Sequence, residues 1–259
     1  MNLNLKGKIV LISASATGLG KGIAEGFLKE EAIVVITDIN NDHINSTLSE
    51  FSAKYNSDNI HSFHGDLSDE STIAECIDTI IAKLGKIDIL IANLGSGRGV
   101  QDWKIEESEW DRMMDLNFNA ARRLINHTVD HMPEDSGSSI VFISSIAGKE
   151  VIGAPMHYSV AKSALIAYST NLSKKLAQRN IRVNSICPGN IFFKEGTWDI
   201  KLKENRDGVL DMLDKTVPLS RFATPEEIGN IVVFLTSEKA SFITGSCIVA
   251  DGGQTVGLY

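Results

Sequence analysis

Short apolar runs alternate along the whole chain with longer stretches in which apolar residues recur at helical spacing. The short runs are mostly unbroken valine, isoleucine and leucine, as expected of strands buried on both faces of a parallel sheet. They predict seven strands, at Lys8–Ser13, Ile33–Thr37, Ile60–His64, Ile87–Ala92, Ser139–Ser144, Arg182–Cys187 and Ser246–Ala250. The periodic stretches predict helices at Lys21–Lys29, Glu70–Leu84, Glu107–His131, Met156–Arg179 and Pro225–Thr236.

This alternation predicts an α/β protein with a doubly wound parallel sheet of the Rossmann type and helices on both faces. No linker or internal repeat interrupts it, so residues 1–259 are expected to form a single nucleotide-binding domain. The exception is the segment 190–217, which is polar, charged and weakly periodic. A segment of that length in a compact domain is usually functional, and we expect a lid over the substrate.

Composition excludes several classes of protein. The net charge of −8 argues against a nucleic-acid-binding surface, and the first apolar run is too short for a signal or membrane span. We therefore expect a cytoplasmic protein with neither nucleic acid nor membrane as a partner. Cys76, Cys187 and Cys247 are widely spaced without a C-x-x-C motif, which favours three reduced thiols over a disulfide framework or a zinc site. His127 and His131 have no third ligand at metal spacing, so no metal is expected.

A turn of small residues follows the first strand and leads into the first helix. It runs Ser13-Ala14-Ser15-Ala16-Thr17-Gly18-Leu19-Gly20. Small residues let the backbone approach a pyrophosphate, and the helix N-terminus offers free N–H groups to it. The glycines alone are a weak signal, but strand, turn, helix and strand follow in the order that a dinucleotide site requires.

The second strand ends at Asp38, eighteen residues after Gly20. A carboxylate there can accept hydrogen bonds from both hydroxyls of the adenosine ribose and would repel a 2′-phosphate. No lysine or arginine precedes Gly18 within the turn or follows Asp38 directly. These residues favour NAD over NADP as cofactor.

Tyr158 and Lys162 are one helical turn apart, so the phenol and the ammonium project from the same face. An ammonium beside the hydroxyl should lower the pKa of the tyrosine, which is normally about 10, and make it a proton donor and acceptor near neutral pH. Ser145 precedes Tyr158 by thirteen residues.

The chain resembles the short-chain dehydrogenase/reductase family of about 250 residues over nearly its whole length. The matching segments are Leu5-Lys6-Gly7-Lys8, the turn from Ser13 to Gly20, Asp66-Leu67, Ala92-Asn93-Leu94-Gly95, Asp115-Leu116-Asn117, Ile143-Ser144-Ser145, Tyr158, Lys162, Pro188-Gly189, Pro218, Arg221, Pro225-Glu226-Glu227, Gly245 and Asp251-Gly252-Gly253. Their order and spacing make chance agreement untenable. The general resemblance is to 3-oxoacyl-carrier-protein reductases and to sugar, polyol or steroid alcohol dehydrogenases.

The resemblance implies hydride transfer between a nicotinamide and a carbinol carbon, with Asn117, Ser145, Tyr158 and Lys162 as the catalytic set. Tyr158 would exchange the hydroxyl proton, Ser145 would bond the carbonyl oxygen, and Lys162 would also hold the nicotinamide ribose. The residues expected at the cofactor are Ser13, Ala14, Ser15, Thr17, Gly18, Leu19, Gly20, Asp38, Ile39, Asp66, Leu67, Asn93, Leu94, Gly95, Tyr158, Lys162, Pro188, Gly189 and Ile191. The partners implied are a small alcohol or ketone and further copies of the chain in a homotetramer.

Two residues depart from the family pattern. Ala14 replaces the first glycine of the turn, which costs little at negative φ and about 1 kcal/mol at positive φ. Phe193 stands where the family often has a threonine that bonds the nicotinamide amide. They favour an alternative, a nucleotide sensor that has lost the reaction, whereas the intact catalytic set argues against it. A sugar-nucleotide epimerase or dehydratase shares the tyrosine–lysine pair but has a longer chain and a different glycine spacing.

Other side chains leave two interpretations open. Arg98 either meets an anionic group of the substrate or is a solvated loop residue, and His157 either faces the substrate or simply starts a helix. Trp103 and Trp110 are expected to pack the fourth helix onto its neighbours.

Overall fold

The computed structural model describes residues 2–134 and 137–257, so positions 1, 135–136 and 258–259 of the expected 1–259 unit lie outside the described residues. Seven parallel strands form one sheet in the order β3-β2-β1-β4-β5-β6-β7. The strands are β1 (Ile9–Ile12), β2 (Ile33–Asp38), β3 (Ile60–His64), β4 (Ile89–Ala92), β5 (Ser139–Ile143), β6 (Arg182–Pro188) and β7 (Cys247–Ala250). All seven predicted strands are present within two residues at each end.

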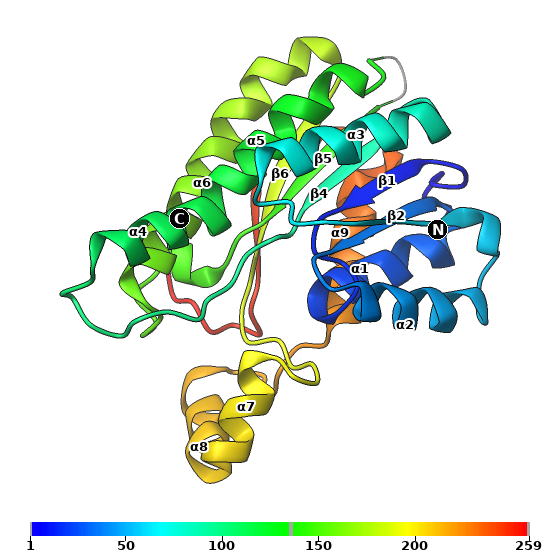
Figure 1. Cartoon of the computed structure of the whole chain (residues 1–259). Helices are drawn as coiled ribbons and strands as arrows, with labels where there is room; N and C mark the ends of the chain where they lie inside the picture. The colour runs from blue at the N-terminus through cyan, green and yellow to red at the C-terminus, as the bar shows by residue number, and fades with distance from the viewer. Residues whose placement is uncertain (1, 135–136, 258–259) are drawn as a thin grey trace.

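Helices cover both faces of the sheet, which confirms the doubly wound fold class (Figure 1). They are α1 (Gly18–Lys29), α2 (Asn41–Ser52), α3 (Glu70–Leu84), α4 (Glu107–Met114), α5 (Ala120–Thr128), α6 (Met156–Leu176), α7 (Thr197–Glu204), α8 (Arg206–Thr216) and α9 (Pro225–Thr236). The helix expected over Glu107–His131 is interrupted by a π-helix at Asp115–Asn119. Among the helices that the structure describes, none is both long and apolar enough to cross a bilayer.

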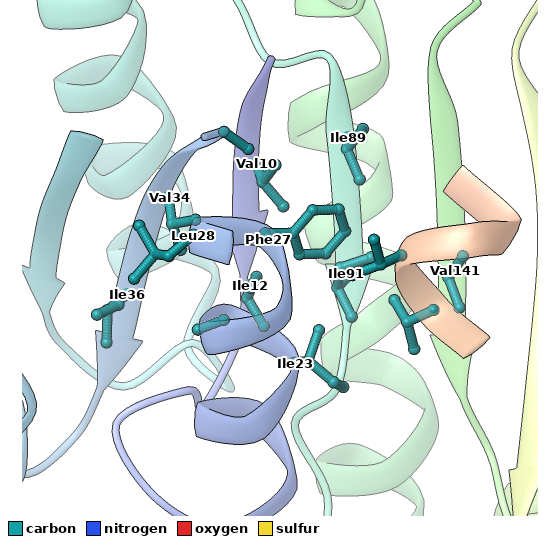
Figure 2. Close-up of a cluster of buried hydrophobic side chains, with 14 of the residues drawn as sticks. Val10, Ile12, Ile23, Phe27, Leu28, Val34, Ile36, Ile89, Ile91 and Val141 are labelled. Carbon is teal, nitrogen blue, oxygen red and sulfur yellow. The ribbon is translucent and has the colours of Figure 1, made fainter. Parts of the chain in front are cut away.

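The unbroken apolar strands are buried on two sides. In β1, Val10 and Ile12 belong to a cluster with α1, α2 and α9, whereas Leu11 belongs to a second cluster with α3, α5 and α6. Figure 2 shows Val10 and Ile12 beside Phe27 of α1. Alternate side chains therefore face opposite layers, which is why the sequence of this strand shows no polar alternation.

Helix α2 was not predicted, because the segment is mostly polar and buries only Ile44, Thr47 and Phe51. Asn40 caps its N-terminus, and the Asn40 side chain accepts hydrogen bonds from the backbone N–H groups of Asp42 and His43.

The segment 190–217, expected as an irregular lid, contains two helices, α7 and α8. None of the residues of α7 is buried, and α8 buries only Val209 and Leu213. In Figure 1 the pair projects away from the sheet and its covering helices.

Trp103 does not pack helix α4, contrary to expectation, since it is 80% exposed. Trp110 does pack, with its ring edge-on to that of His157 at a centroid distance of 5.8 Å.

Candidate active site

A cleft of about 420 Å³ opens at the carboxyl ends of the central strands. The ends of β1, β2, β4, β5 and β6 all contribute lining residues, because the carboxyl ends of parallel strands lie along one edge of the sheet. The lining residues are Ala14, Thr17, Gly18, Leu19, Gly20, Asp38, Asn93, Gly95, Ser96, Gly97, Arg98, Ile143, Ser144, Ser145, Tyr158, Lys162, Pro188, Gly189, Ile191, Phe193, Glu195, Gly196 and Thr197. Most of the residues expected at the cofactor are among them.

The glycine turn forms a close-fitting backbone cradle. A Cβ atom on Gly20 would lie 2.3 Å from the carbonyl oxygen of Ala14 and 2.7 Å from Nδ2 of Asn93, so only glycine fits there. Thr17, which caps α1, makes no side-chain hydrogen bond to the first turn. The N–H groups of that turn therefore keep their capacity to bind an anion. This cradle fits the pyrophosphate of a dinucleotide.

Ala14 has a φ of +51°, so its backbone is in the left-handed region, where a residue with a Cβ atom is strained. Two hydrogen bonds hold Ala14 in this conformation. Its N–H donates to Oγ1 of Thr37 at 3.2 Å, and its carbonyl oxygen accepts from Nδ2 of Asn93 at 2.9 Å. Thr37 was not identified from the sequence; its position as the buried residue before Asp38 is the only signal.

A second hollow of about 190 Å³ shares Ala14 and Asp38 with the cleft. Its other lining residues are Thr37, Ile39, Gly65, Asp66, Leu67, Ser68, Leu94 and Leu116. The structure thus brings together the residues expected around the adenosine, from the ends of β2, β3 and β4.

Asp38 lies between these two hollows at the end of β2. Its carboxylate accepts a hydrogen bond from the backbone N–H of Asn40 at 2.9 Å, and Nδ1 of His43 lies 3.8 Å away. The side chain is 11% exposed and contributes to the lining of both hollows.

Two of the expected cofactor residues face inward instead. The Ser13 hydroxyl accepts hydrogen bonds from the backbone N–H groups of Asn93 and Leu94, both at 2.9 Å. The Ser15 hydroxyl donates to the carbonyl oxygen of Ile12 at 2.8 Å. Both serines are buried and line neither hollow, so they hold the turn in shape rather than present a group to the cleft.

Ser145, Tyr158 and Lys162 meet on the other side of the cleft. Tyr158 and Lys162 extend from the first two turns of α6, and Ser145 follows β5 and caps a short 3-10 helix at Ile146–Gly148. The Lys162 ammonium lies 5.8 Å from the centre of the Tyr158 ring and donates to the carbonyl oxygen of Ile143 at 2.9 Å. The helical spacing read from the sequence therefore produces the expected convergence.

The proton equilibria differ from the expectation of a tyrosine pKa lowered by lysine. Burial raises the pKa of Tyr158 and outweighs the opposing effect of its hydrogen bond with Ser145. Burial also lowers the pKa of Lys162 to about 8. Desolvation thus brings the pKa of the lysine, rather than that of the tyrosine, closer to neutral pH.

Asn117 lies in the π-helix and is fully buried. Its Oδ1 accepts from the backbone N–H of Ser96 at 3.0 Å, and its Nδ2 donates to the carbonyl oxygens of Ser96 and Met113, both at 3.1 Å. A Cβ atom on Gly95 would lie 2.6 Å from Oδ1 of Asn117 and 3.0 Å from Nζ of Lys162. Asn117 therefore adjoins the lysine through the loop after β4, although it does not line the cleft itself.

Arg98 and His157 have different environments. Arg98 is exposed at the cleft and donates to the carbonyl oxygen of Glu195 at 3.2 Å, which connects the loop after β4 with the segment 190–217. His157 does not line the cleft. It is fully buried, with Nε2 3.1 Å from Oε1 of Glu109, which favours a packing role at the start of α6 over contact with a substrate.

Phe193 is the most prominent departure at the cleft. Its ring lies so close to Gly18 that a Cβ atom there would be 2.7 Å from a ring carbon. The ring therefore lies over the N-terminus of α1, on the same peptides that would bind a pyrophosphate. The sequence identified the substitution but not this position, which depends on how the segment 190–217 returns to the turn.

The part of the chain that the structure describes contains no group of three or more histidine, cysteine, aspartate or glutamate side chains arranged to hold a metal ion. His127, considered above as a ligand, instead pairs with Glu70, with 3.5 Å between Nε2 and Oε1.

Comparison with known proteins identifies the class to which this fold and site belong. A family model described as enoyl-(acyl carrier protein) reductase matches residues 13–255. The chain is 32% identical over 257 residues to 3-oxoacyl-[acyl-carrier-protein] reductase FabG of Thermotoga maritima, covering 98% of this chain and all of that protein. It therefore belongs to the short-chain dehydrogenase/reductase family and is an NAD(P)-dependent oxidoreductase.

Two further relatives act on sugars or sugar acids, as their names state. The 2-dehydro-3-deoxy-L-rhamnonate dehydrogenase (NAD(+)) of Sphingomonas is 30% identical over 250 residues, 96% of each protein. The crystal structure of L-sorbose reductase from Gluconobacter frateurii, complexed with NADPH and L-sorbose, is similar over the full length of both chains. It has a TM-score of 0.94 and 30% identity.

Proposed function

We propose that this protein interconverts a secondary alcohol and a ketone with NAD(H), using Ser145, Tyr158, Lys162 and Asn117. The observation that carries the proposal is the convergence of Ser145, Tyr158 and Lys162 on one cleft that also includes the glycine turn. A nicotinamide cofactor bound there would supply or accept the hydride.

Each side chain has a role that its position supports. Ser145 and Tyr158 both line the cleft, so a carbonyl oxygen placed between the two hydroxyls would receive two donors as negative charge develops on it. Tyr158 then delivers its proton to that oxygen in reduction and recovers it in oxidation. Lys162, with its ammonium 5.8 Å from the ring centre, stabilises the phenolate that remains.

Asn117 positions this set rather than contacting the substrate. It fixes Ser96 and thereby the loop after β4, and this loop adjoins both Tyr158 and Lys162. We also assign to Asn117 the role that the resemblance to the short-chain dehydrogenase/reductase family implies for it, which is to support a water chain from Lys162 to solvent.

The test replaces Tyr158 by phenylalanine, which removes one oxygen and keeps the ring. Turnover should fall by roughly 10²–10⁴-fold, while cofactor affinity changes little. The assay follows NADH with a panel of ketones and alcohols that includes a 3-oxoacyl thioester, ketoses, polyols and steroid alcohols. Unchanged turnover by the Tyr158→Phe protein, on a substrate that the wild type converts, would refute the assignment.

A nucleotide sensor of the same fold is the competing function, and the departures from the family pattern at Ala14 and Phe193 are its support. This protein would bind the dinucleotide but convert no member of the panel. Tight binding of NADH without turnover of any carbonyl or alcohol would therefore decide for the sensor.

For the cofactor, we infer a preference for NAD(H), supported by the accessible carboxylate of Asp38 and the absence of lysine or arginine among Ile39, Asn40 and Asn41. L-sorbose reductase, in contrast, is complexed with NADPH in its crystal structure. NAD(H) should bind at least tenfold more tightly than NADP(H), about 1.4 kcal/mol. Fluorescence titration measures both affinities. Asp38→Ala should reduce the difference between the two affinities, mainly by weakening the binding of NAD(H). Equal affinities for NAD(H) and NADP(H) in the wild type would contradict the inference.

We propose that residues 1–259 act as one domain in which the segment 190–217 is the lid. Its contact with the rest of the cleft through Arg98 and Glu195 and the scarcity of buried side chains in α7 and α8 support this role. Limited proteolysis should cut this segment readily without ligand and more slowly with NADH. Identical cutting in both conditions would contradict the proposal.

We also propose a homotetramer. The small residues Ala161, Ala164 and Ala167 of α6 resemble those of the family's dimer-forming helix, but Ala161 is fully buried within the chain. Val160, 44% exposed, takes its place beside Ala167, and Phe242 next to β7 is fully exposed. These apolar positions support assembly through two faces. Light scattering should give four times the chain mass, and a monomer mass would contradict the proposal.

A further inference from the structure

Two thiols, on the neighbouring strands β6 and β7, lie in contact near one edge of the sheet. Sγ of Cys187 is 3.1 Å from Sγ of Cys247, although the residues are sixty positions apart in sequence. Cys187 is fully buried and Cys247 is half-buried, and neither forms a disulfide in the structure.

The register of β6 and β7 brings the two sulfurs together. Cys247 pairs with Ser185, and residues two apart in a strand point to the same face, so Cys187 and Cys247 share one side of the sheet. This side is the one covered by α6, because Val183 belongs to the cluster that α6 helps to form. A disulfide requires a sulfur separation of about 2.04 Å, so the sulfurs need to approach by only about 1 Å.

The two thiols differ in acidity. The contact with Cys187 lowers the pKa of Cys247, with further lowering by the Ser185 hydroxyl and the charge of Lys149. The same contact, together with burial, raises the pKa of Cys187. Cys247 is also the more exposed of the two thiols, so it is the one that a reagent reaches first and the nucleophile of the pair.

We propose that Cys187 and Cys247 form a reversible intramolecular disulfide when the protein meets a hydroperoxide. The Cys247 thiolate attacks a peroxide oxygen, the O–O bond breaks, and the leaving oxygen takes up a proton, which produces a sulfenic acid. The Cys187 sulfur then attacks the Cys247 sulfur, the S–O bond breaks, and water leaves with the Cys187 proton. Two electrons pass from the two thiols to one peroxide, and a dithiol reverses the change.

The disulfide would lie next to groups of the cleft. The Cys187 thiol contacts the Ser144 hydroxyl and the backbone N–H of Ser145. Pro188 and Gly189, which follow Cys187 directly, line the cleft. Oxidation would therefore link the end of β6 covalently to β7, directly before Pro188 and Gly189 at the cleft. The inference concerns only these thiols and does not depend on the proposed reaction.

The test treats the purified reduced protein with hydrogen peroxide, alkylates the remaining thiols under denaturing conditions and measures intact mass and peptides. One alkylated thiol, a loss of two hydrogen atoms and a cross-linked peptide joining Cys187 to Cys247 are expected, with full reversal by dithiothreitol. Cys76 supplies the matched control, since it is also buried but has no sulfur partner, and burial raises its pKa to about 12.

Cys76→Ser should leave the cross-link intact, whereas Cys187→Ser and Cys247→Ser should each abolish it. The peptide map of the wild type needs no variant, so failure of a variant to fold does not affect the answer. Three alkylated thiols after treatment, a sulfinic acid on Cys247 with Cys187 still free, or a cross-link between two chains would each overturn the proposal.

Discussion

Replacing Ala14 by glycine should stabilise the protein, because Ala14 has a φ of +51°. A residue with a Cβ pays about 1–2 kcal/mol in the left-handed region, and glycine does not. The greater conformational freedom of glycine in the unfolded chain offsets this stabilisation by about 0.4–1 kcal/mol. The net increase in the free energy of unfolding should therefore be about 0.5–1 kcal/mol.

Ala16, two residues further along the same turn, provides the control. It is 1% exposed and its φ is not positive. Ala16→Gly relieves no strain. It removes a buried methyl group and gives the unfolded chain more conformational freedom, so the free energy of unfolding should fall by about 1–2 kcal/mol in total. The two substitutions make the same chemical change and should act in opposite directions.

The assay is thermal unfolding of the cofactor-free protein, followed by far-ultraviolet circular dichroism at one protein concentration, because assembly would make Tm concentration-dependent. Ala14→Gly should raise Tm by about 1–4 °C, and Ala16→Gly should lower it by about 2–8 °C. If Ala14→Gly lowers Tm as much as Ala16→Gly does, the reasoning from backbone strain is wrong.

Three further outcomes are expected. Lys162 should titrate near pH 8 in ¹³C-lysine NMR of the protein without cofactor. The spectrum of Lys162→Met identifies the Lys162 signal, because that signal is absent from it. A pKa near 10.5, the ordinary value for a solvated lysine, would contradict the desolvation of Lys162. Since folding lowers this pKa, this group makes folding stability rise with pH between about 8 and 10.5. Phe193→Ala should bind NADH several-fold more tightly, because the ring no longer covers Gly18; Phe192→Ala is the control, and equal affinities would argue against the obstruction. Thr224→Ala should lose about 1 kcal/mol of stability with the capping box of α9, seen as a lower Tm; an unchanged Tm would count against the cap.

The sequence predicted features that depend on local pattern or fixed spacing. The strands were evident because burial on both faces requires unbroken apolar runs, and Tyr158 met Lys162 because four residues make about one helical turn. The polar helices were missed for the converse reason. Helix α2 is held by the Asn40 cap and by a few buried side chains, so its segment shows little apolar periodicity.

Features that depend on tertiary neighbours could not be derived from the chain alone. Cys187 and Cys247 are widely spaced in sequence and meet only because β6 and β7 are adjacent. The pKa of Tyr158 was expected to fall beside a lysine, but burial of the phenol dominates, and burial is set by the surrounding fold. The position of the Phe193 ring over Gly18 likewise depends on how the chain returns from β6.

The projecting pair of helices α7 and α8 has a consequence for how this protein diverges (Figure 1). With two buried residues between them, substitutions there should mostly change stability by less than about 0.5 kcal/mol. A mutation in a central strand, by contrast, disturbs one of the two buried clusters that lie between the sheet and its covering helices. We expect amino-acid changes to accumulate in 197–216 while the strands hold their sequence. Grafting this segment between relatives would therefore exchange the projecting helices, with Thr197 at the cleft, and preserve the sheet.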